Sequence, residues 1–165
     1  MKDAWFNGLL FVGTVLGMEA WAWFSHKYLL HGPLWFLHKS HHQKAPTWWE
    51  WNDLVAVLYG LISTALVMYG IHFGSPVKYI GFGIGVYGVL YFILHDVIIH
   101  RRIKTRWDPQ NPYLVRLIRA HRAHHRHIHQ ADSEAFGFLY AIRKYAVDKK
   151  KLKAVSARQV QEGSN

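Results

Sequence analysis

Ten of the thirteen histidines of this chain fall into four short clusters whose spacing suits metal binding. The clusters read HKYLLH (26–31), HKSHH (38–42), HDVIIH (95–100) and HRAHH (121–125). Neutral imidazole binds iron, zinc, copper and nickel well. Because such ions take roughly four to six ligands each, ten imidazoles exceed the needs of one ion. The clusters therefore indicate two ions with four or five histidines each.

The two kinds of spacing make different demands on a helix. In an H-x-x-H-H helix the three side chains share one face about 100° wide. Residues five apart, as in H-x4-H, lie about 140° apart on an ideal helix of 3.6 residues per turn. An H-x4-H pair therefore straddles a site, or its helix bends.

Acidic and amide side chains lie close to the clusters in the sequence. A ligating histidine needs an acceptor for its second ring nitrogen, and the candidate acceptors are Asp96, Asp53, Asn52 and Glu50. Glu19 precedes His26 by seven residues, on the same helical face. A carboxylate within an apolar stretch is costly and indicates a function, so we expect Glu19 to support a ligand or to line the substrate entry.

Three apolar stretches must position these clusters, and each is long enough to cross a bilayer as a helix. They are Ala4–Phe24, Leu54–Phe73, and Tyr79–Leu94 with its continuation to His100. Asp53 is a candidate N-cap for the second, and Gly81, Gly85 and Gly88 allow close helix contact in the third. The piece at 135–142 is too short to span. The predicted fold is all-α: an integral-membrane bundle of three to four transmembrane helices with a cytoplasmic, histidine-rich di-metal cap.

The order of the stretches places all four clusters on one side of the membrane. The same side carries 18 of the 20 Lys and Arg residues, and only Lys2 and Lys78 lie on the other. The positive-inside rule makes the cluster side cytoplasmic, as in a multi-pass protein of a bacterial inner membrane. We expect a membrane domain over residues 1–145 and a basic, flexible tail over 146–165.

The composition excludes several classes of site and partner. There is no cysteine, so disulfides, thiolate zinc sites and iron–sulfur clusters are ruled out. The net charge of +10 suits membrane lipid or an acidic protein, and we expect no nucleic-acid partner. His72 is expected to be structural, and His127 and His129 are expected to face solvent or lipid headgroups.

The ordered motifs resemble those of the fatty acid hydroxylase superfamily of integral-membrane di-iron oxygenases. The stretches MEAWAWFSHKYLLHG, HKSHH, WNDLVAV, VYGVLYFILHDVIIHRR, YLVRLIRAHRAHH and FGFLYA carry the resemblance, from about Met18 to Ala141. NDL, YGVLYFILHD and FGFLYA narrow it to the carotenoid branch. The resemblance implies two iron ions, replaceable by zinc in a purified sample, with O2 as co-substrate. The implied ligands are His26, His31, His38, His41, His42, His95, His100, His121, His124 and His125.

The resemblance also implies a reaction and partners. The reaction is hydroxylation of C3 of the β-ionone rings of carotenoids, with electrons supplied by ferredoxin and ferredoxin reductase. Trp21, Phe24, Tyr87 and Tyr91 are the candidate substrate-binding residues, together with Trp35, Phe36 and Phe92. The expected docking surface for an acidic ferredoxin consists of Arg101, Arg102, Lys104, Arg106, Arg116 and Arg119.

Other functions share parts of this pattern. A carotenoid ketolase, a sterol or fatty acyl hydroxylase and a desaturase would use the same metal chemistry in a different pocket. A metal transporter or metal-binding membrane module would hold its ligands nearer the middle of its helices. A basic membrane-surface scaffold would not need the clusters.

Overall fold

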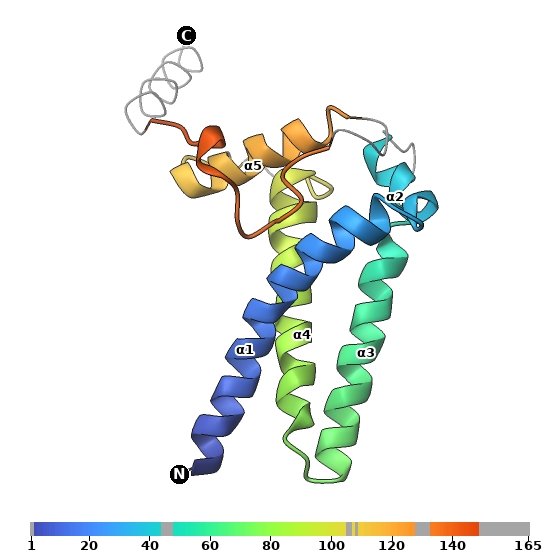
Figure 1. The fold of residues 1–165 in the computed structure, drawn as a ribbon, viewed down its shortest axis with the longest axis vertical. Helices are drawn as coiled ribbons and strands as arrows, with labels where there is room; N and C mark the ends of the chain where they lie inside the picture. Colours follow the sequence, from blue (N-terminus) through green and yellow to red (C-terminus); the bar gives the residue numbers. More distant parts are fainter. Residues whose placement is uncertain (1, 44–47, 105–106, 108, 128–132, 149–165) are drawn as a thin grey trace.

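The computed structural model describes residues 2–43, 48–104, 107, 109–127 and 133–148, and every regular element in these ranges is a helix (Figure 1). The expected basic tail beyond residue 148 and His129 lie outside the described residues.

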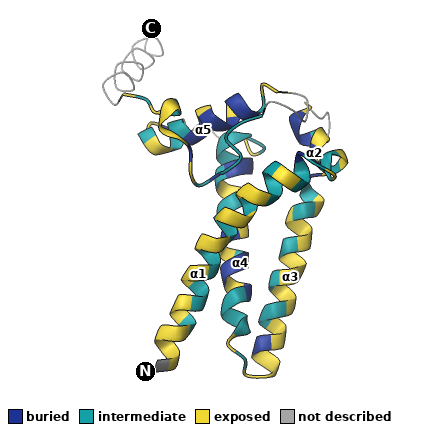
Figure 2. Cartoon of the chain, in the orientation of Figure 1, coloured by how far each residue is buried: buried dark blue, intermediate teal, exposed yellow. Residues whose placement is uncertain are grey.

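Three long helices form the stem of the molecule (Figure 1). They are α1 (Lys2–Phe24) continued by η1 (Ser25–Leu30), α3 (Asp53–His72), and α4 (Val77–Tyr91) continued by η2 (Phe92–Ile99). Each is long and apolar enough to cross a membrane. Their outward faces expose large apolar side chains such as Trp5 and Leu61, as lipid contact requires (Figure 2). The prediction of three spans is confirmed, and the described residues contain no fourth.

Helix α4 packs against both α1 and α3, whereas α1 and α3 diverge (Figure 1). A Cβ atom at Gly81 would lie 2.8 Å from the Ser63 carbonyl oxygen of α3, and one at Gly83 would lie 2.7 Å from the Thr14 Cβ of α1. Glycine at these two positions therefore permits the close approach of the helices. Gly88 was expected to do the same, but no atom beyond its own stretch of helix lies within 4 Å of where its Cβ would be, and Gly88 lines a cavity instead.

The segment at 135–142 neither spans nor forms a helix. The Glu19 carboxylate fixes it, because Oε1 accepts hydrogen bonds from the backbone N–H groups of Phe138, Leu139 and Tyr140 at 2.9 to 3.1 Å. The Tyr87 hydroxyl donates to the other oxygen of Glu19 at 2.8 Å. A carboxylate in the apolar stem thus satisfies three backbone amides of an irregular segment.

A cap of short helices covers one end of the stem (Figure 1). It contains α2 (Trp35–His42), α5 (Pro112–His124) and the 3₁₀ turn η3 (Arg143–Tyr145). The side chain of Asn111 accepts from the Tyr113 backbone N–H at 2.9 Å and so caps the start of α5. All four histidine clusters lie at this end, and His72 lies exposed at the far end of α3. The prediction that the clusters share one side is confirmed.

Candidate metal centre

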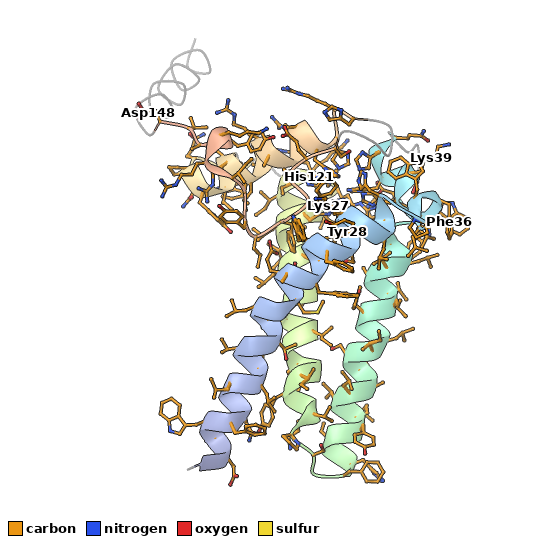
Figure 3. All side chains as sticks on the ribbon, in the orientation of Figure 1. Lys27, Tyr28, Phe36, Lys39, His121 and Asp148 are labelled. Atoms are coloured by element: carbon orange, nitrogen blue, oxygen red, sulfur yellow. The ribbon has the colours of Figure 1, made fainter. Side chains whose placement is uncertain are left out.

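The ten clustered histidines converge in the cap as two adjacent groups. The ligand nitrogens of each group lie within 4.8 Å of one another. The first group contains His26, His31, His38, His42 and His124. The second contains His41, His100, His121 and His125, and His95 joins it because its Nε2 lies 3.1 Å from Nε2 of His41. Figure 3 places His121 among the cap side chains, above the stem.

Each H-x-x-H-H motif contributes to both groups. The outer histidines of α2, His38 and His42, belong to the first group, while His41 between them belongs to the second. In the motif at the end of α5, His121 and His125 belong to the second group, and His124 between them belongs to the first. The groups also touch directly, since the rings of His42 and His125 stack with centroids 4.5 Å apart. The two groups therefore form one interlocked centre.

Both H-x4-H pairs lie on π-helical turns, η1 and η2. The backbone N–H of His31 donates to the His26 carbonyl at 2.9 Å, and that of His100 donates to the His95 carbonyl at 2.8 Å. A hydrogen bond five residues apart, instead of four, brings both ends of the interval to the same side of the helix. The rings then lie 5.2 Å apart in the first pair and 4.6 Å apart in the second. The helix therefore widens at these pairs, and each pair serves one group.

Hydrogen bonds at Nδ1 fix the tautomer of six histidines. Each of these six Nδ1 atoms lies 2.8 to 3.0 Å from an oxygen acceptor. The pairs are His26 with Phe136 O, His38 with Asn52 Oδ1, His41 with Glu50 Oε2, His42 with His127 O, His95 with Asp96 Oδ1, and His124 with Glu134 O. Because these acceptors require Nδ1 to carry the proton, each Nε2 keeps a free lone pair.

The lone pairs of these Nε2 atoms point at one another. The Nε2 of His38 lies 2.9 Å from that of His26 and 3.2 Å from that of His42. Two acceptors at this distance repel each other unless a cation lies between them. Metal–imidazole bonds of about 2.1 Å place neighbouring ligand nitrogens roughly 3 Å apart. The buried Nε2 of His125 has no hydrogen-bond partner, and the residues therefore fit metal ions at both groups.

Burial keeps these imidazoles neutral. Burial, with a smaller contribution from neighbouring charged groups, lowers the pKa of His42 and of His100 from 6.5 to about 4. The pKa values of His41 and His121 are also lowered well below 6.5, mainly by burial and then by adjacent imidazoles. Neutral imidazole is the form that binds metal.

Arg102 gathers three carboxylates beside the second group. Its guanidinium lies 2.8 Å from Asp53, 3.1 Å from Glu50 and 3.8 Å from Asp96. Two of these carboxylates hold candidate ligand histidines, His41 and His95. Arg102 was expected to lie on a docking surface, and the structure instead places it in this network with its side chain only 14% exposed.

Asp53 was expected to cap α3, and its role in the structure is different. It is the first residue of the helix, and its carboxylate accepts from the Glu50 backbone N–H and binds Arg102. Within the described residues the Glu19 carboxylate is hydrogen-bonded to Tyr87 and to the backbone just beyond Phe136, whose carbonyl holds His26, and not to a histidine.

An apolar cavity of about 400 Å³ lies between α1, α3 and α4, directly below the histidines. Four histidines, one from each cluster, reach its wall: His26, His38, His95 and His121. Trp21, Tyr87, Tyr91 and Phe92 line it as expected.

The other aromatic candidates lie outside this cavity. Phe24 was expected to bind substrate, but it does not line the cavity: the residue is 41% exposed, and its ring packs against Trp21 and Tyr28. Trp35 packs against histidines of the first group, and Phe36 lies on the outer side of α2 (Figure 3).

Several groups that act in this centre could not be found by sequence reasoning. The carbonyls of Phe136, Glu134 and His127 leave no side-chain signature, because any residue supplies a carbonyl. The role of Arg102 was also missed, because only the folded chain brings the carboxylates of Glu50, Asp53 and Asp96 together around its guanidinium. The Tyr59 hydroxyl, which accepts from Trp21 Nε1 across the cavity between α3 and α1, was also missed.

Known proteins with similar sequences were compared with this chain. The fatty acid hydroxylase family profile matches residues 11–146. The chain is 42% identical to a β-carotene hydroxylase of Pantoea ananas over 135 residues, which cover 82% of this chain and 77% of that protein. It is 41% identical to a β-carotene hydroxylase of Paracoccus sp. (strain PC1) over 134 residues, covering 81% and 83% of the two. No solved structure matches significantly.

Three membrane-length helices, a polyhistidine centre and these relatives define the class of protein, a hydroxylating oxidoreductase of the membrane. Within that class, the chain belongs to the fatty acid hydroxylase family.

The assignment of neighbouring residues to different groups can be tested with His124→Ala and His125→Ala. We expect each variant to retain one metal equivalent per chain where the unaltered protein holds two, because each removes a ligand from one group only. Metal content measured by plasma mass spectrometry checks this.

The matched control is His127→Ala, because only the backbone carbonyl of His127 takes part in the centre. It should keep both equivalents. Retention of two equivalents by both test variants would contradict the assignment.

Proposed function

We propose that this protein is a non-haem di-iron, O2-dependent monooxygenase that hydroxylates C3 of the β-ionone rings of carotenoids. One observation carries the proposal: an apolar cavity within the membrane stem ends at ten converging imidazoles. Relatives named β-carotene hydroxylase, at 41 to 42% identity, support the substrate class.

The residues of the chain would bind, orient and shield the substrate. A cavity of about 400 Å³ suits one ring end of a carotenoid, because the whole molecule is a rod about as long as the roughly 30 Å hydrocarbon core. The remainder of the rod would lie between the diverging helices α1 and α3, in contact with lipid. Trp21, Tyr87 and Phe92 provide apolar contact and exclude water.

Iron held by the histidines would supply the O2 activation that insertion into an unactivated C–H bond requires, with two electrons per turnover delivered by an external donor. The Tyr91 hydroxyl is a proton-bearing group at the boundary between the cavity and the second group, 3.4 Å from His95 Nε2. The ring of Tyr91 stacks on that of His95 with centroids 4.4 Å apart, which fixes the hydroxyl in place.

The geometry disfavours a transporter. A transporter holds its ions near the middle of the bilayer, whereas these histidines gather at one end of the stem. A ketolase, a desaturase or a hydroxylase of other lipids would share the centre, so the reaction product distinguishes these enzymes.

Expression in bacteria that produce β-carotene tests the reaction. We expect cryptoxanthin and zeaxanthin to appear, detected by chromatography of the extracted pigments. Ketolated pigments would indicate a ketolase, and unchanged pigment from metal-loaded protein would overturn the proposal.

A cavity-filling variant tests the binding place. Gly88 lines the cavity with open space beside it, so Gly88→Leu should abolish hydroxylation and leave the metal content unchanged. Gly13→Leu on the exposed face of α1 is the matched control, because no atom beyond its own stretch of helix lies within 4 Å of its Cβ position. It should retain activity.

The cap is proposed to face the cytoplasm of a bacterial inner membrane, since Lys and Arg are concentrated at that end. The chain lacks cysteine, so single cysteines report orientation cleanly. An impermeant maleimide should label His72→Cys in intact spheroplasts and Lys39→Cys only after lysis. The reverse pattern would overturn the proposed orientation.

The electron donor is proposed to be an acidic ferredoxin, served by ferredoxin reductase, that docks on the outer face of α5. Arg119 and Arg122 are exposed there, and opposite charge speeds association. Arg119→Glu with Arg122→Glu should raise the KM for reduced ferredoxin, with kcat unchanged, in nanodiscs of neutral lipid. An unchanged KM would remove this surface from consideration.

A further inference from the structure

The two histidine groups differ in the charge of the oxygens that hold them. In the first group, His26, His38, His42 and His124 all donate from Nδ1 to neutral oxygens, three backbone carbonyls and the Asn52 amide. In the second group, His41 and His95 donate to the carboxylates of Glu50 and Asp96, each at 2.8 Å.

Carboxylate acceptors change the basicity and the orientation of the imidazole that binds a metal. A hydrogen bond to an ionised acceptor is roughly twice as strong as one between neutral groups. A carboxylate on the far nitrogen also raises the basicity of the ligating nitrogen and fixes the ring. The two carboxylate-held histidines lie next to each other, with their Nε2 atoms 3.1 Å apart. Both effects therefore act on the same metal position.

Arg102 holds this arrangement in place. Its single guanidinium contacts Glu50, Asp53 and Asp96, and its backbone N–H donates to the Asp96 carbonyl at 2.9 Å. Without a cation, three half-buried carboxylates this close together would repel one another. Arg102 thus fixes both acceptors and leaves carboxylate charge in excess beside the second group.

We infer that the two metal positions are inequivalent, and that the second histidine group binds its ion more tightly because Glu50 and Asp96 hold His41 and His95. Glu50, Asp96 and Arg102 are positioning residues in this scheme, since they act through the histidines. The inference rests on the proposed metal centre.

Zn²⁺ binding to metal-depleted, detergent-solubilised protein tests the inference without reference to activity. Dialysis against graded chelator, with zinc counted by plasma mass spectrometry, should remove two ions from the unaltered chain in two steps. Glu50→Gln and Asp96→Asn keep the shape of the acceptor and remove its charge. Each should weaken the tighter step by roughly 10- to 100-fold and leave the weaker step unchanged.

Glu134→Gln is the matched control. Its carboxylate binds Lys144 and Tyr145, and only its backbone carbonyl holds His124. The same change of Glu to Gln should therefore leave both steps in place. A shift as large as that of Glu50→Gln would overturn the inference.

A measurement on the unaltered chain avoids dependence on the variants. In crystals of half-chelated protein, the stronger anomalous zinc peak should lie between His41 and His95. Equal peaks, or a stronger peak at the first group, would overturn the inequivalence and leave the proposed centre intact. Failure of the unaltered chain to bind zinc would overturn the centre itself, and the inference with it.

Discussion

The structure depends on one electrostatic constraint, which is that many imidazole lone pairs are held facing one another in a buried space. Nitrogens such as Nε2 of His26 and His38 lie 2.9 Å apart, a distance that a shared cation stabilises. The surrounding chain maintains this arrangement from outside. Oxygens from the loop before α3, from η2 and from the segment after α5 bind the Nδ1 atoms, and Glu19 fixes part of that last segment in turn.

The sequence predicted the features that follow from apolar length and charge. Three membrane-length helices and four clusters at one end of them were expected and are present, because span length and chain direction leave few alternatives. Side-chain acceptors near the clusters were also foreseeable. Asp96 directly follows His95, Glu50 and Asn52 stand in the loop between the second cluster and the next span, and each of the three receives a hydrogen bond from a histidine.

Other features depend on tertiary contacts that no local pattern encodes. Backbone carbonyls at Phe136 and Glu134 act as acceptors only because the chain after α5 returns beneath the cap. Arg102 resembles a surface cation in the sequence, and only the folded chain brings Glu50 and Asp53 to it. Gly88 was assigned to a helix contact by helical periodicity, which does not show that a cavity lies between α1, α3 and α4 at this position. Phe24 was named for its aromatic side chain near the end of the first apolar stretch, which does not show that its ring packs against Trp21 and Tyr28 outside the cavity.

The widened turns at His26–His31 and His95–His100 have a consequence for how such chains vary over time. A residue added to or removed from either four-residue interval would rotate everything beyond it by about 100°, and would turn the second imidazole away from its partner. Point substitutions between the histidines leave that rotation untouched. The four residues between each pair of histidines should therefore tolerate substitution but not insertion or deletion, because the length of the interval sets the position of the second imidazole.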